Sequence, residues 1–132
     1  MKVHHYTLPL KPLPWTQTKH PANLFYDNQK HIRNCYIFYF EQQHGDKKPF
    51  QGPLWVDREF YFPIPDLLRR RPTDQEMWMY TMPGLDHCNK LLIESMKIAG
   101  VIKDDKYICK ESGIKKYSKN PRIVVTITEL DT

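Results

Sequence analysis

Residues 85–99 of the chain read LDHCNKLLIESMKIA, and this stretch predicts a helix that packs on a sheet. At 100° per residue, its apolar and small side chains fall within a sector of about 100°, which is typical of a helix with one buried face. This set comprises Leu85, Cys88, Leu92, Ser95, Met96 and Ala99. The charged side chains Asp86, Lys90, Glu94 and Lys97 fall on a separate side. Gly100 follows the last helical residue, where a left-handed conformation is favoured.

Strands are predicted on both sides of this helix, at residues 54–62, 77–82, 107–110 and 122–129. In the first of these, side chains alternate between two faces, as they do in a half-buried strand. One face carries Leu54, Val56, Phe60 and Phe62. Arg58 is the one residue out of pattern, because it falls on this apolar face.

The N-terminal third predicts one more strand and one more helix. Residues 3–8 are strand-like and run into a proline-rich segment, whose missing N–H groups would break a ladder. Apolar residues then recur at i, i+3, i+4, i+7 and i+8 from Ile32 to Phe40, which indicates an amphipathic helix. Asp27 or Asn28 is expected to cap its start, and Gly45 to end it. The order of elements favours an α/β (α+β) fold, a small mixed β-sheet packed against two main helices.

Length and composition bound the class of protein. A chain of 132 residues with 40% hydrophobic residues predicts a single domain, residues 1–132, with a real core. No apolar run is long enough to span a membrane, and the N-terminus lacks the apolar core of a signal peptide. Three cysteines without a CxxC pair favour reduced thiols, so a cytoplasmic protein is expected. The net charge of +5 is compatible with a polyanionic partner but does not establish one.

An acidic cluster surrounds the helix of residues 85–99. Asp86, Lys90 and Glu94 are spaced so that a helix aims them in nearly one direction, and Asp104 and Asp105 follow the helix closely. Converging carboxylates are what a hard divalent cation such as Mg²⁺ requires. The alternatives are a solvated helix face and an acidic turn, which are common on spacing alone.

The same residues carry a resemblance to a known family. The run Gly84-Leu85-Asp86-His87-x-x-Lys90, the helix ending in Gly100, the Asp104-Asp105 pair and the strand at residues 124–129 resemble the RusA family of Holliday junction resolvases. The similarity covers residues 82–130 well and the first 80 residues loosely. It implies a structure-selective DNA endonuclease that acts in recombination and repair, uses Mg²⁺ or Mn²⁺, and cuts four-way junction DNA as a homodimer.

The resemblance also implies roles for individual residues. Carried over position by position, the catalytic residues are Asp86, Lys90 and Asp105, and the metal ligands are Asp86, Asp104 and Asp105. Two positions depart from the family motif, because its first aspartate falls on Gly84 and its asparagine on His87. Either another carboxylate completes the site, or the chain is a catalytically impaired junction-binding protein of the same fold. The candidates for that carboxylate are Glu94, Asp104, Asp74 and Glu76.

Basic side chains lie on both sides of this cluster in the sequence, as contacts with a phosphate backbone would need. The expected DNA-binding residues are Arg69, Arg70, Arg71, Lys103, Lys106, Lys115 and Lys116. Trp78 and Tyr80 precede the motif and could stack on or wedge between bases, or could instead lie in a core or a dimer interface.

Overall fold

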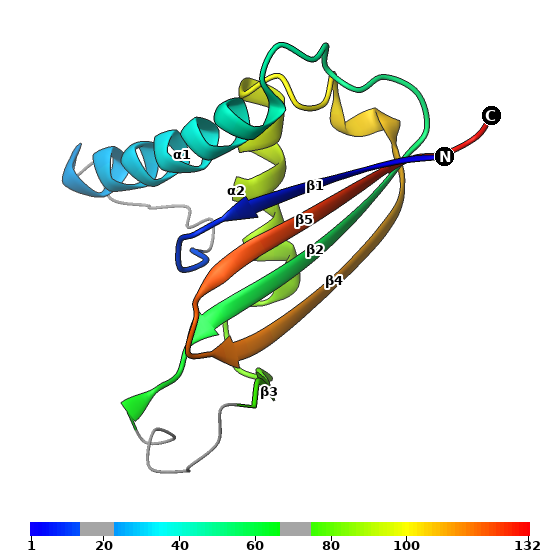
Figure 1. Ribbon diagram of the computed structural model, residues 1–132. Helices are drawn as coiled ribbons and strands as arrows, with labels where there is room; N and C mark the ends of the chain where they lie inside the picture. Colours follow the sequence, from blue (N-terminus) through cyan, green and yellow to red (C-terminus); the bar gives the residue numbers. More distant parts are fainter. Residues whose placement is uncertain (14–22, 67–74) are drawn as a thin grey trace.

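The computed structural model describes residues 1–13, 23–66 and 75–132 of the chain, which form one mixed sheet and two helices (Figure 1). Its elements in chain order are β1 (Lys2–Leu8), α1 (Asn23–His44), β2 (Leu54–Pro63), β3 (Met77–Trp78), α2 (Leu85–Ile98), the short 3₁₀ helix η2 (Asp105–Tyr107), β4 (Ile108–Ser118) and β5 (Arg122–Glu129). The expected α+β class and the order of its elements are therefore confirmed. In the described ranges, no helix is both long enough and apolar enough to cross a membrane.

The five strands lie in the order β1-β5-β2-β4-β3. β2 and β4 are parallel, whereas the pairs β1–β5, β2–β5 and β3–β4 are antiparallel. A parallel pair needs a crossover connection, and here the connection from β2 to β4 includes α2. This crossover brings α2 across the sheet, close to the two strands that it links (Figure 1).

The core lies between one face of the sheet and the two helices. On β2 the buried positions alternate with partly exposed ones, and Leu54, Val56 and Phe60 are at most 1% exposed. They join one cluster that includes the fully buried Leu92 and Met96 of α2. The predicted periodicities of 2 and 3.6 residues therefore place the core on the correct faces of both elements.

α1 is fastened to β1 by polar contacts as well as by packing. The buried Tyr6 hydroxyl lies 2.7 Å from Nδ1 of His44, and Nε2 of His44 lies 3.1 Å from the Lys48 carbonyl oxygen. Because a carbonyl oxygen only accepts, Nε2 carries the proton and Nδ1 accepts from Tyr6. The side chain of Gln43 also bonds both the N–H and the C=O of Thr7. α1 therefore covers the sheet edge formed by β1.

Several predicted boundaries are wrong. α1 begins at Asn23, so residues 27 and 28 lie inside the helix and neither caps it. β3 comprises only Met77–Trp78, whereas a strand over residues 77–82 was expected. β4 continues to Ser118 instead of ending at residue 110, because its lysine-rich half pairs with β2 on one side and β3 on the other. Gly45 and Gly100 do end their helices, with positive φ values of 64° and 79°.

Candidate active site

The loop before α2 fixes the start of the helix that carries the motif residues. Gly84 is the N-cap of α2, in an extended conformation (φ −72°, ψ 161°) that any residue can adopt. The ammonium of Lys115 on β4 donates to the carbonyl oxygens of Thr81 and Pro83, at 2.8 and 2.6 Å. These two bonds tie the loop to the sheet directly before Asp86.

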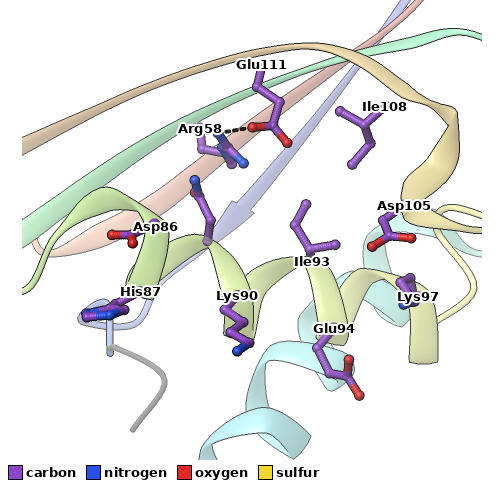
Figure 2. A pocket seen from close by; sticks show the side chains of 11 residues that line it. Arg58, Asp86, His87, Lys90, Ile93, Glu94, Lys97, Asp105, Ile108 and Glu111 are labelled. Atoms are coloured by element: carbon purple, nitrogen blue, oxygen red, sulfur yellow. Dashed lines mark ion pairs between the residues drawn. The ribbon is translucent and has the colours of Figure 1, made fainter.

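A pocket of about 640 Å³ lies between α2 and the strands β2 and β4 (Figure 2). Its wall on α2 includes Asp86, Lys90 and Glu94. Figure 2 shows that Asp86 points in a different direction from Lys90 and Glu94. Asp105 of η2 closes the other end of the pocket. The remaining lining residues are Arg58, His87, Asn89, Ile93, Lys97, Ile108 and Glu111.

Arg58 and Glu111 meet at the sheet side of the pocket (Figure 2). Nη2 of Arg58 lies 3.6 Å from Oε2 of Glu111; the arginine side chain is 4% exposed and the glutamate side chain 55%. Burial lowers the pKa of the Arg58 guanidinium from its usual value, and the carboxylates of Glu111 and Asp57 oppose that shift. Arg58 is thus an arginine held largely out of water beside an acidic site.

Asp104 has a different position from Asp105. It is the N-cap of η2, where its side chain accepts a hydrogen bond of 3.2 Å from the N–H of Lys106, and it is not among the residues that line the pocket. Its pKa is lowered, first by a hydrogen bond with the Asp105 side chain and then by the Lys106 N–H. Asp104 therefore caps a turn, as the turn alternative predicts, whereas Asp105 lines the pocket.

The other carboxylates named as candidates are distributed unevenly. Glu94 lines the pocket, whereas Glu76 forms an ion pair of 3.3 Å with Arg122 and is not a lining residue. Asp74 lies outside the described residues, as do the predicted DNA-binding residues Arg69, Arg70 and Arg71.

The expected DNA-binding lysines have different surroundings. Lys103 and Lys106 are exposed beside η2, and the Lys106 ammonium lies 5.3 Å from the centre of the Tyr107 ring. Lys116 places its ammonium 4.3 Å from the centre of the Trp78 ring, which is itself 63% exposed. Lys115 instead uses its ammonium to brace the loop before α2.

The pocket offers the kind of donor atoms that a divalent cation needs. Carboxylate oxygens are the ligands that Mg²⁺ and Mn²⁺ prefer, and the pocket has Asp86, Glu94, Asp105 and Glu111. In the described part of the chain, however, no group of three His, Cys, Asp or Glu side chains lies close enough to hold a metal ion. The donors are therefore of the right kind but do not form a complete cation site.

Gly84 accounts for one missing carboxylate. A Cβ built at this position would lie only 2.8 Å from Oδ1 of Asp86. A side chain at residue 84 would therefore lie next to the Asp86 carboxylate, where a second carboxylate could share a cation with it.

Sequence reasoning missed the contribution of the two strands to the pocket. Arg58 of β2 and Glu111 of β4 lie on the helix-facing side of the sheet. The parallel register brings them close, because it pairs Glu111 with Val56 and Arg58 with Gly113. The only signal in the sequence was that Arg58 interrupts the apolar face of its strand.

The fold and this site define a small α+β protein with an acidic pocket over a parallel strand pair, and the comparison with known families agrees. The family model described as endodeoxyribonuclease RusA matches residues 13–128. The match covers most of the chain, so the chain belongs to the RusA family of Holliday junction resolvases, which are endodeoxyribonucleases. No match was found among curated proteins.

Proposed function

We propose that this protein is a structure-selective endonuclease that resolves four-way DNA junctions in recombination and repair by cutting phosphodiester bonds in the cytoplasm. The observation that supports the proposal is that Asp86, Lys90 and Asp105 line one pocket, in a chain that belongs to the RusA family. These three residues are separated by up to 19 positions in sequence, so their place around one pocket depends on the fold.

We assign Asp86 and Asp105 as the essential carboxylates and Lys90 as the cation that offsets charge on the reacting phosphate. Asp104 would support Asp105 from the neighbouring position. Mg²⁺ or Mn²⁺, when bound at these carboxylates, would supply an activated water and stabilise negative charge on the phosphate. Lys103, Lys106 and Lys116, together with the arginines at 69–71, would contact the DNA backbone without reading its sequence.

A homodimer is the assembly that this function calls for. A four-way junction has two-fold character, and its resolution needs two symmetric cuts. One chain offers one such pocket in its described part, so two copies related by a two-fold axis would supply the pair of sites.

A synthetic four-way junction incubated with the purified protein and Mg²⁺ or Mn²⁺ tests the proposal. We expect paired nicks from the wild-type protein and at least a hundredfold slower cutting by Asp86→Asn and Asp105→Asn, since each change removes a charge without changing shape. The absence of nicks at high protein concentration, or undiminished nicking in both variants, would contradict the endonuclease assignment.

A second candidate function is favoured by Gly84. With no group of three ligands in the described residues, the protein could bind junctions without cutting them. Tight, salt-sensitive junction binding without cleavage would support this alternative, and restored cutting in Gly84→Asp would identify the missing carboxylate as its cause.

A further inference from the structure

Arg58 lies in a place where the fold favours an apolar residue. Its neighbours on the same face of β2 are Val56 and Phe60, which are 0% and 1% exposed, and the Arg58 side chain is only 4% exposed. A guanidinium is costly to bury unless its N–H groups have acceptors. A position that breaks the local pattern at such a cost is often a functional one.

The donors of Arg58 are poorly satisfied within the described part of the protein. Nε and Nη1 are buried and have no hydrogen-bond partner. Nη2 lies 3.6 Å from the Glu111 carboxylate, which is too far for a good hydrogen bond, and Glu111 is half exposed to water. A buried guanidinium with two unpaired donors therefore lines the pocket that also contains Asp86 and Asp105.

We propose that Arg58 is a phosphate-binding residue, whose buried Nε and Nη1 groups donate hydrogen bonds to backbone phosphodiester oxygens of the DNA in this pocket. This proposal rests on the proposed function. The planar guanidinium holds its N–H donors in fixed directions, and only a hydrogen-bond acceptor such as a phosphate oxygen satisfies them. A metal ion would leave these donors unpaired.

The charges of the pocket fit an occupant of this kind. Three basic side chains, Arg58, Lys90 and Lys97, and four acidic ones line the pocket, so only a slight excess of negative charge opposes a phosphate there. Arg58 is the most buried of the charged residues there, and the field of a buried charge is least screened by salt. A phosphate seated against Arg58 would stay next to Asp86 and Asp105, where the chemistry is proposed to occur.

A purely structural role and a phosphate-binding role for Arg58 predict different properties of the Arg58→Met variant. If the arginine only served to pair with Glu111, Arg58→Met would lower thermal stability and leave junction binding unchanged. If it binds phosphate, Arg58→Met keeps the apolar stem and removes a poorly bonded buried charge. Its melting temperature should then be equal to or above that of the wild type, while DNA binding is weakened.

The test is a titration of a four-way junction in EDTA at several salt concentrations, so that binding is measured without cleavage. For Arg58→Met we expect binding weaker by about ten- to hundredfold, as for a lost hydrogen-bonded charge, and a salt slope reduced by about one. Arg58→Lys should fall between this variant and the wild type, because a lysine keeps the charge and loses the planar fork. Arg33→Met, on α1 and away from the pocket, is the matched loss of one arginine and should keep the slope.

A second measurement separates this proposal from the proposed function. The Nε–H signal of Arg58 can be followed by NMR in the wild-type protein, assigned by its loss in Arg58→Lys, while a phosphodiester-linked dinucleotide is added. A shift of that signal supports the phosphate site even if junctions are neither bound selectively nor cut. Junction cutting by the wild type, with unchanged affinity and salt slope in Arg58→Met and no shift of the Nε–H signal, would overturn the phosphate site and leave the endonuclease intact.

Discussion

Replacing Gly84 by aspartate is expected to create a tighter divalent-cation site in this protein. The backbone at residue 84 is extended and accepts any side chain, so the substitution brings no backbone strain. The new Cβ would lie 2.8 Å from Oδ1 of Asp86, but that atom ends an exposed side chain that can turn away. The two carboxylates would then be neighbours on the rim of the pocket.

The size of the effect follows from Coulomb's law. Two carboxylates about 4 Å apart repel each other by about 1 kcal/mol in water and about 4 kcal/mol at the effective dielectric constant near a protein surface. A cation bound between them removes this repulsion and gains a ligand. We therefore expect the dissociation constant for Mn²⁺ to fall by about fivefold or more in Gly84→Asp, with faster junction cleavage.

Calorimetric titration of Mn²⁺ into the wild type and three variants is the assay. Gly84→Asn is the matched control, because it has the same shape without the charge, and Gly84→Ala controls for the Cβ alone. In EDTA, Gly84→Asp should unfold at a lower temperature than Gly84→Asn, and Mn²⁺ should reverse that order. Equal Mn²⁺ affinities in the aspartate and asparagine variants would show that residue 84 does not face a cation.

Three further predictions concern the scaffold. Leu92 of α2 is fully buried, so Leu92→Ala should lower the free energy of unfolding in urea by about 2 to 5 kcal/mol, and a loss below 1 kcal/mol would contradict its place in the core. Burial lowers the pKa of His44 from its ordinary value of 6.5, so below that pH the unfolded chain binds a proton more readily than the folded chain does. Stability should then fall as the pH drops from 7.5 to 5.5, by at most about 1.4 kcal/mol per pH unit, and a His44→Gln protein with an equally steep decline would refute this. Burial raises the pKa of the Cys88 thiol to about 11, and Cys109 is exposed, so iodoacetamide followed by mass spectrometry should label Cys109 in the native protein and Cys88 only in denaturant.

The sequence predicts those parts of the fold that local pattern controls. The periodicity of residues 85–99 predicts the correct buried face of α2, and the spacing of Asp86, Lys90 and Glu94 predicts that they lie outside the core. Gly45 and Gly100 marked real helix ends, because a positive φ is a local property of the backbone. Such features depend on neighbours a few residues apart, which a single sequence records.

What depends on distant pairing was not predictable in the same way. The second half of β4 is rich in lysine and does not show the pattern of a strand. It forms one because it pairs with β2, whose residues lie some 50 positions away in the sequence. The contact of Arg58 with Glu111 depends on the parallel register of β2 and β4, which no local pattern fixes. The bonds of Lys115 to the loop before α2 also depend on packing, and its contact with DNA stays a prediction.

The position of β5 between β1 and β2 governs the order in which the sheet can assemble. β5 pairs with β1 on one side and β2 on the other, with Lys2 opposite Glu129. During synthesis, β1 leaves the ribosome before β2 and β4, whereas its partner β5 leaves after them. In the described part of the chain, β1 has no other strand to pair with, so the sheet closes only after translation of β5. Contacts of such high sequence separation also slow folding, and nascent β1 exposes an unpaired edge that other chains can join.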